Sequence, residues 1–318
     1  MTETLCAWIM RLSFQHIEVR MVKIGFWMQE IRAPFLSLSV ALVFLGTAVG
    51  LAGGSFSLTR ALLALVGLLL VHASVNLLNE YSDFRTGIDF HTLRTPFSGG
   101  SGMLTAGKIS PPAAHVAGIG CLAAGGAIGC VLMWLTNIGL LPLLIIGGFS
   151  VYFYTDVLAR NALGEVFAGL GLGLLPILGA SFIQTGHYSG AALAAGIPAG
   201  ILTLNVLLLN EFPDLDADVK GGRRNLLTVF GKEAAGKIYT LLLVVMYGWI
   251  AVAVIVGFMP VYCLAALFTL VTAWRPMMWA WNGGKDIGTM IPALGDNVVT
   301  NLATQTVLGL GFLCSVYV

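Results

Sequence analysis

Long apolar stretches alternate with short polar ones along most of the chain. Nine of them approach the roughly 20 apolar residues that a helix needs to cross a bilayer. Because every backbone polar group in lipid needs a partner within its own segment, these stretches are predicted to be helices. They cover 35–54, 58–79, 113–135, 140–157, 166–183, 191–209, 239–258, 261–278 and 298–318.

The composition supports a membrane protein that crosses the bilayer several times. Of the 318 residues, 58% are hydrophobic and only 10% are charged, whereas a soluble domain is about 25% charged. The net charge of +1 gives no sign of a nucleic-acid partner. The five cysteines are scattered without a CxxC pair, which argues against a disulfide framework or a thiolate metal site.

Residues 1–33 precede the first apolar stretch and have no signal-peptide pattern. Their first half could be an amphipathic helix at the membrane surface. A simple terminal extension is the favoured interpretation. Residues 34–318 are predicted to form a single transmembrane domain.

The basic residues predict how the chain is oriented. Lys and Arg lie in the N-terminal segment and in the loops that follow every even-numbered span, while the odd loops have none. Arg60 lies just inside the second span. By the positive-inside rule, the N-terminus and the even loops are cytoplasmic, and the C-terminus lies outside.

A short polar motif ends both the second and the sixth span. It reads LLNEYSD at 77–83 and LLNEFPD at 208–214, on the same predicted side of the membrane. The repeat divides the domain into two similar halves, about 34–157 and 163–281, followed by a last helix at 298–318. Hydrated helix ends with incidental acids would explain one copy, but not a matched pair. Ionisable residues at membrane depth usually have a function.

Helical spacing selects which side chains in the first copy share a face. His72, Asn76, Asn79 and Asp83 succeed one another at intervals of four, three and four residues, which places them on one side of a helix. Asp89 comes after a glycine that lets the chain turn back. Glu80 is expected to point off this face, where it would be solvated or would support the others.

The second copy repeats the pattern with Asn210, Asp214 and Asp218 at intervals of four. Pro213 is expected to weaken the helix there. Asp216 and Glu211 are not expected to act directly. Carboxylate and amide oxygens suit Mg²⁺, which often binds through a few carboxylates together with substrate phosphates.

Basic residues come after both acidic clusters, so the pair of clusters suits an anion with several charges. A diphosphate fits, because a metal ion can take some of its oxygens and arginines the others. The glycine-rich loop at 99–108 could add backbone amides, although an ordinary turn explains it equally well. The candidate cations are Arg85, Arg94, Lys220 and Arg224.

These residues resemble the two Asp-rich motifs of the UbiA superfamily of membrane prenyltransferases. The first is similar to NxxxDxxxxxD, and its longer spacing is similar to the 1,4-dihydroxy-2-naphthoate polyprenyltransferase branch, which makes menaquinone precursors. The second, at 214–218, is similar to DxxxD and precedes a basic tail, KGGRRNLLTVFGK. The stretch 154–166 is also similar, but residues 156–158 replace a proline-rich stretch often seen in the family.

The resemblance implies an all-α bundle of nine helices in two halves around a cavity. It also implies Mg²⁺-dependent transfer of a prenyl group from an isoprenyl diphosphate to an aromatic acceptor, at the cytoplasmic side. Tyr154 would orient the diphosphate or shield a cation, unless it is only an interfacial aromatic. Arg160 joins the diphosphate-binding set by the same resemblance. The implied metal ligands are Asn79, Asp83, Asp89, Asp214 and Asp218, with Asp83 and Asp214 essential and Asn76, Asn210 and His72 in supporting contact.

Two other classes of protein remain open at this stage. A cation-coupled transporter also uses internal repeats with buried acids. The acids here lie at helix ends rather than at mid-membrane, and the repeat is parallel. A lipid-binding protein without catalysis is disfavoured by the intact carboxylates. Alternative acceptors are hydroxybenzoate, homogentisate, a chlorophyllide, haem or a glycerol-phosphate lipid.

Overall fold

The computed structural model describes residues 23–317, which form helices and no strand. The predicted alternatives for the first twenty residues lie outside this range. The elements are η1 (Ala33–Leu36), α2 (Ser37–Ala52), α3 (Leu58–Thr86), η2 (Ile88–Phe90), α4 (Pro111–Leu135), η3 (Ile138–Leu140), α5 (Leu141–Phe153), η4 (Leu158–Arg160), α6 (Gly164–Gly169), η5 (Leu170–Leu174), α7 (Leu175–Thr185), α8 (Gly190–Lys220), α9 (Leu226–Ile255), η6 (Val261–Thr269), α10 (Leu270–Trp281) and α11 (Met290–Tyr317).

The helices confirm the predicted polytopic membrane architecture. Eight helical segments between residues 23 and 317 are long and apolar enough to cross a bilayer. The fourth predicted span corresponds to a shorter apolar helix, Ile138–Phe153. The eighth span, Val261–Trp281, combines η6 with α10 and accommodates Pro276 within the helix.

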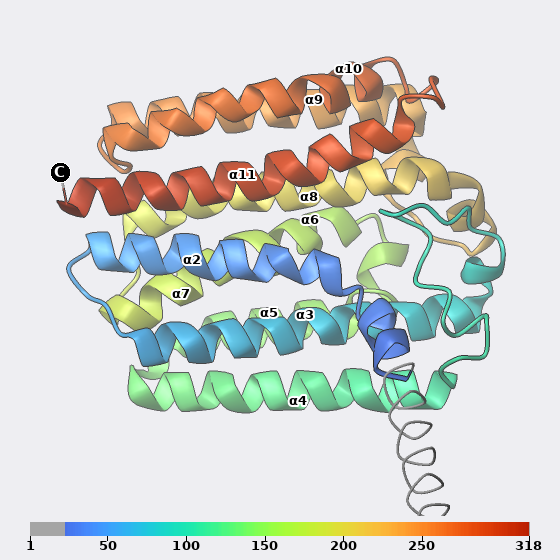
Figure 1. Ribbon diagram of the computed structural model, residues 1–318, viewed down its shortest axis with the longest axis horizontal. Helices are drawn as coiled ribbons and strands as arrows, with labels where there is room; N and C mark the ends of the chain where they lie inside the picture. Colours follow the sequence, from blue (N-terminus) through green and yellow to red (C-terminus); the bar gives the residue numbers. More distant parts are fainter. Residues whose placement is uncertain (1–22, 318) are drawn as a thin grey trace, which may run out of the picture.

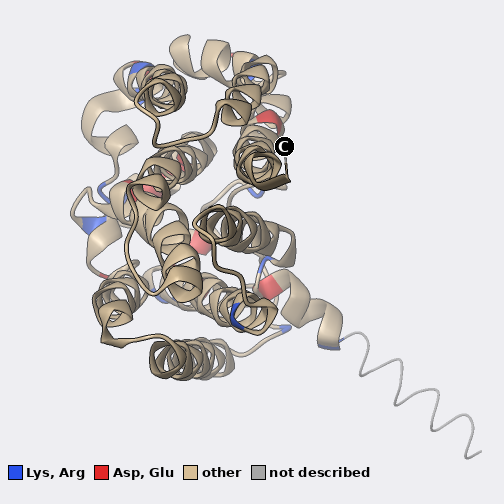
Figure 2. Cartoon of the chain, turned by 90° about the vertical axis from the view of Figure 1, so that its left-hand side faces the viewer, with Lys and Arg blue, Asp and Glu red and all other residues tan. Residues whose placement is uncertain are grey.

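The long helices lie side by side, and the loops after α3 and α8 meet at the same end of the bundle (Figure 1). Figure 2 shows the bundle end-on, with few charged residues among its helices. Both acidic motifs therefore belong to one end of the molecule. This is the arrangement that a parallel repeat predicts.

The two helices that carry the motifs extend beyond their apolar cores. α3 continues to Thr86, and α8 continues through Pro213 to Lys220. Pro213 has no N–H group to donate within the helix, but it does not interrupt α8, which packs against α6, α9 and α11. As a result, the acids of each motif up to Asp83 and Asp218 sit on continuous helices.

Glycines allow the wall formed by α6 and η5 to approach α8 closely. A Cβ atom on Gly173 would lie 2.6 Å from the Cα of Gly200, and one on Gly169 would lie 2.5 Å from the Gly200 carbonyl oxygen. Leu172 departs from helical geometry with φ −115° and ψ 35°. Its carbonyl accepts a hydrogen bond of 2.7 Å from the Thr203 hydroxyl. Small residues at such crossings are typical of membrane helix packing.

Candidate active site

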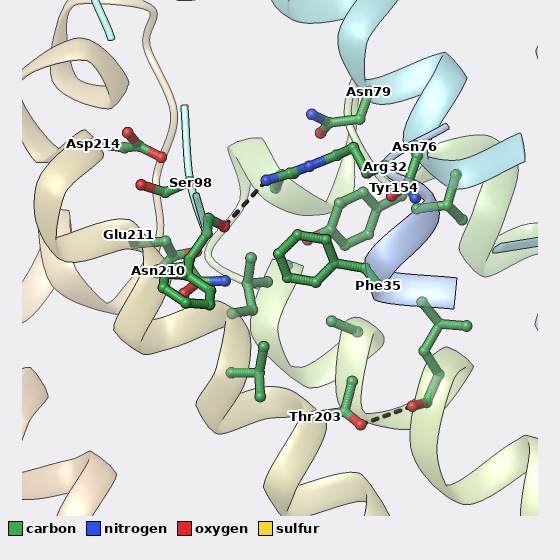
Figure 3. Close-up of a pocket in the computed structure, with 18 of the residues that line it drawn as sticks. Arg32, Phe35, Asn76, Asn79, Ser98, Tyr154, Thr203, Asn210, Glu211 and Asp214 are labelled. Carbon is green, nitrogen blue, oxygen red and sulfur yellow. Dashed lines mark hydrogen bonds between the residues drawn. The ribbon is translucent and has the colours of Figure 1, made fainter. Parts of the chain in front are cut away.

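One cavity brings both acidic motifs together (Figure 3). Its walls come from η1, α2, α3, η2, α5, η4, α6, η5, α8 and α11, together with the loop 97–100. Every residue predicted to bind the metal or to support a ligand lines it, as does Tyr154. They are Asn79, Asp83, Asp89, Asp214 and Asp218, with His72, Asn76 and Asn210.

The cavity is polar at the acidic end and mostly apolar elsewhere. Its apolar lining includes Leu38, Val75, Phe167, Leu172, Val206 and Leu302. A cavity with one charged end and one apolar side suits a ligand with an anionic head and a hydrocarbon tail.

Arg223 joins the two motifs across the cavity. Its guanidinium forms an ion pair with Asp83 and donates to the Asn79 side-chain oxygen at 3.1 Å. It also lies 3.5 Å from Asp218. Burial acts to lower the pKa of Arg223, but the Asp83 and Asp218 carboxylates outweigh it and hold that pKa above its ordinary value. The guanidinium therefore stays charged between two carboxylates from different halves.

Asn79 and Asn225 complete this network. The Asn79 amide donates to Asp83 at 2.8 Å, and Thr155 donates to the Asn79 oxygen at 3.3 Å. On the opposite side, the Asn225 amide donates to Asp218 at 2.8 Å. Asp83 and Asp218 are thus well supplied with donors.

Asp89 and Asp214 each have one carboxylate oxygen without a hydrogen-bond partner among the described residues. Asp89 Oδ2 and Asp214 Oδ1 are buried and have no hydrogen-bond partner among the described residues, and the same holds for Asn210 Oδ1 and Glu211 Oε2. Burial, with the nearby Glu80 and Asp83 carboxylates, raises the pKa of Asp89 to about 8. A cation at these oxygens would offset the unfavourable burial of negative charge.

The cavity has the donors for Mg²⁺ but no complete cage. No three His, Cys, Asp or Glu side chains within residues 23–317 gather into a ready metal site. Magnesium commonly binds through one or two carboxylates and takes its remaining ligands from water and substrate phosphates. The free oxygens of Asp89 and Asp214 fit that mode of binding.

The glycine-rich loop is held by carboxylates of both helices. The Gly99 amide donates to Asp214 Oδ2 at 3.2 Å, and the Ser101 amide donates to the two Glu80 oxygens at 2.8 and 2.9 Å. Gly100, with φ +73°, passes so close to Asp89 that a Cβ atom would lie 2.9 Å from its Oδ1. These amides position the acids, so Gly99 and Ser101 do not offer them freely to a diphosphate.

Glu80 supports the loop rather than facing solvent. Its side chain is buried, and the Ser101 hydroxyl lies 2.9 Å from Glu80 Oε2 and 2.6 Å from Glu30 Oε2. The pKa of Glu30 is raised to about 7. Burial is the main cause, the Ser101 hydrogen bond opposes it, and the negative charge of Glu80 adds to it. Of the two roles expected for Glu80, solvation is wrong, because the loop folds back over it.

The basic residues predicted from the sequence lie outside the cavity lining. Four of them are exposed and Arg160 is half-buried. The Arg85 guanidinium lies 5.8 Å from the centre of the Tyr81 ring, and Arg94 donates to Thr105 at 2.5 Å. The exposed set is Arg85, Arg94, Lys220 and Arg224.

Two arginines that the predicted set omits face the cavity instead, Arg32 and Arg223. Arg223 comes after two glycines, and Gly222 takes φ +73°, which turns the chain back towards the site. From this glycine pair, the sequence could have predicted a turn that brings Arg223 back to the site. Arg32 is the last charged residue before the first span, and its spacing gave no such signal.

The remaining predicted residues have partners of their own. His72 Nδ1 lies 3.0 Å from the Ser39 hydroxyl, so His72 is a hydrogen-bonded helix residue. The Asn76 amide donates to the Ile31 carbonyl at 2.7 Å. The Tyr154 ring faces the cavity near Asn76 and Arg32 (Figure 3).

The fold and this cavity define an integral, multi-pass membrane protein of a known enzyme family. A sequence model described as the UbiA prenyltransferase family matches residues 39–286. The chain belongs to the UbiA prenyltransferase family, and it is an intramembrane prenyltransferase.

Two relatives are similar to this chain over most of its length. A 1,4-dihydroxy-2-naphthoate octaprenyltransferase from Bacillus subtilis is 30% identical over 235 residues, covering 72% of this chain and 73% of its own. A UbiA prenyltransferase domain-containing protein 1 from Danio rerio is 30% identical over 231 residues, covering 71% and 67%.

Solved structures share the fold at lower identity. A UbiA homologue from Aeropyrum pernix superposes with a TM-score of 0.68 at 16% identity, covering 89% of this chain and 98% of its own. A homologue from Archaeoglobus fulgidus bound to GPP and Mg²⁺ gives a TM-score of 0.62 at 17% identity, covering 91% and 99%.

Proposed function

We propose that this protein transfers a prenyl group from an isoprenyl diphosphate to 1,4-dihydroxy-2-naphthoate, with Mg²⁺ as the cofactor. The observation that carries the proposal is the pair of free carboxylate oxygens, on Asp89 and Asp214, that face one cavity from opposite motifs. A relative named as a naphthoate octaprenyltransferase and a homologue bound to GPP and Mg²⁺ support the substrates and the metal.

The contacts of each residue indicate its role in the proposed reaction. Asn79, Asp83, Asp89, Asp214 and Asp218 would hold Mg²⁺, which neutralises charge on the departing diphosphate when bound. Arg223 places a fixed positive charge beside the same end of the cavity. It would stabilise the diphosphate as it leaves, because its donors are already oriented.

The apolar lining of the cavity would bind the hydrocarbon chain of the isoprenyl diphosphate. It surrounds the hydrocarbon chain and excludes water from the reacting carbon, which protects an allylic cation from hydrolysis. Tyr154 faces this space and would present its ring to that cation. The acidic end would open to the cytoplasm, as the basic loops predict.

Direct assay of the purified protein tests the proposal. Geranyl diphosphate and longer prenyl diphosphates are incubated with naphthoate, hydroxybenzoate, homogentisate and a glycerol-phosphate lipid, and the products are identified by mass. We expect a prenylated naphthoate-derived product that requires Mg²⁺ and is lost in Asp214→Asn. A product from another acceptor alone would contradict the naphthoate assignment.

A second measurement separates the enzyme from a cation-coupled transporter. Geranyl diphosphate should raise the thermal unfolding midpoint only when Mg²⁺ is present, because both ligands share one site. Stabilisation by a monovalent cation alone, with no response to the diphosphate, would favour transport.

A further inference from the structure

Arg32 is a cavity cation that the proposed function leaves without a role. It lies between the helix at 23–30 and η1, and its side chain reaches into the cavity beside Phe35 (Figure 3). One N–H group donates to the Phe97 carbonyl at 3.1 Å, and the guanidinium carbon lies 5.0 Å from the centre of the Phe35 ring. No carboxylate in the described part of the chain forms an ion pair with it.

The backbone at Arg32 is held in an unfavourable conformation. Its φ of 52° and ψ of 51° lie in the left-handed region, which residues with a Cβ atom rarely adopt. The Asn76 amide fixes the preceding carbonyl of Ile31 at 2.7 Å, and the Phe35 amide donates to the Arg32 carbonyl at 2.9 Å. Strain of this kind persists where the surroundings enforce it, and it concentrates at functional sites.

Arg32 lies in the same cavity as the acidic network, near enough for its charge to act on Asp83 and Asp214, but it forms no ion pair with either of them. Arg223 lies within the acidic network, whereas Arg32 is bordered by the aromatic rings of Phe35 and Tyr154 (Figure 3). A guanidinium has five donors in a planar fork, of which the Phe97 carbonyl takes one. The free edge of that fork matches a carboxylate, and the neighbouring rings suit a flat aromatic molecule.

We propose that Arg32 binds the anionic substituent of the aromatic acceptor, a ring carboxylate, and that Asn76 positions Arg32. The proposal rests on the proposed prenyl transfer and adds a requirement to it. The acceptor is recognised by its acidic group as well as by its ring. Asn76, expected from the sequence to support the metal ligands, instead acts on the cation that selects the acceptor.

A comparison of two acceptors tests this directly. Wild-type protein and Arg32→Gln are assayed with 1,4-dihydroxy-2-naphthoate and with 1,4-dihydroxynaphthalene, which lacks the carboxylate. We expect Arg32→Gln to reduce kcat/KM for the carboxylated acceptor roughly 10- to 100-fold, as for loss of a hydrogen bond to a charged group, mainly through KM. The rate with the carboxylate-free acceptor should stay unchanged.

Three further variants sharpen the result. Arg32→Lys should recover part of the preference, since the charge remains without the fork. Asn76→Ala should weaken the same preference to a smaller extent. Arg275→Gln is the matched control, because Arg275 pairs with Asp296 at 3.1 Å, outside the cavity lining.

Specific outcomes overturn the inference. Equal losses with both acceptors in Arg32→Gln and Arg32→Lys would assign Arg32 a purely structural role. Loss of Mg²⁺-dependent stabilisation by geranyl diphosphate in Arg32→Gln would assign it to the diphosphate instead. If wild-type protein prenylates neither this naphthoate nor another ring carboxylate, the acceptor assignment itself fails; prenyl transfer without any carboxylate preference overturns only the role of Arg32.

Discussion

The two acidic motifs are nearly identical in sequence but differ in their contacts. In the first, Asp83 is paired with Arg223 and hydrogen-bonded to Asn79. In the second, the residue at the same place in the repeat is Asp214, which keeps one buried oxygen free. By its contacts, Asp83 corresponds instead to Asp218, which also touches Arg223.

The repeat therefore describes where the helices end, and not what each carboxylate does. Arg223 comes from the second half and compensates a carboxylate from each half. The free oxygens on Asp89 and Asp214 lie next to the loop 99–101, which comes from the first half. Groups from both halves therefore meet in one network, because Arg223 pairs with Asp83 of the first half and the Gly99 amide of the first half donates to Asp214 of the second.

The largest expected effect comes from removing the shared cation. In Arg223→Gln, two buried carboxylates lose their compensation, which costs about 3 kcal/mol in unfolding free energy. Prenyl transfer should fall roughly 10³-fold through loss of an oriented donor. Thermal unfolding and product formation measure the two effects. Arg224→Gln, at the exposed neighbouring position, should change both far less; equal losses would contradict the assignment of Arg223.

The next effect separates the two matched aspartates. Asp83→Asn and Asp214→Asn should each reduce activity roughly 10³-fold, as for loss of a group that acts on developing charge. Only Asp83→Asn should also lower stability, by about 1–3 kcal/mol, because it removes the charge that pairs with the Arg223 guanidinium. Unfolding midpoints without Mg²⁺ check this, and identical midpoints in the two variants would show that the motifs are equivalent.

A smaller effect is expected at the loop that holds the acids. Ser101→Ala removes the hydroxyl between Glu80 and Glu30. The Mg²⁺ concentration for half-maximal activity should rise about 10-fold, the cost typical of residues that orient metal ligands. Activity at saturating Mg²⁺ should largely recover. Ser110→Ala, at an exposed serine with no capping bond, is the control; an unchanged Mg²⁺ requirement would exclude this role for Ser101.

The smallest effect is expected at Asp216, an exposed acid inside the second motif. Asp216→Asn should alter stability by no more than about 0.5 kcal/mol, as for most surface substitutions. Activity should stay near the wild-type value in the same assay. A large loss would place Asp216 among the working carboxylates.

Regular helical geometry made part of the site predictable from the sequence. Steps of three and four residues placed Asn79 with Asp83, and Asp214 with Asp218, on cavity-facing sides. Apolar length predicted the spans, although α5 is shorter than expected and Pro213 does not interrupt α8. These features depend on local geometry, which the sequence determines directly.

The sequence could not predict contacts made across loops. Arg223 reaches the site through a turn at Gly221 and Gly222, and its partner Asp83 is 140 residues away. Glu80 is buried because the loop at 98–101 returns over it, which no helical spacing reveals. Charge alone therefore favoured the exposed Arg94 and Arg224 over the half-buried Arg223.

The close contact of Gly169 and Gly173 with Gly200 has a consequence for how the protein tolerates change. Alanine and valine are as compatible with a membrane-spanning helix as glycine is. However, no side chain fits between the two backbones at these positions. At this helix contact, a hydrophobic substitution is therefore not necessarily a tolerated one. Inactivating variants are to be expected there, in an uncharged stretch of helix that carries none of the acids.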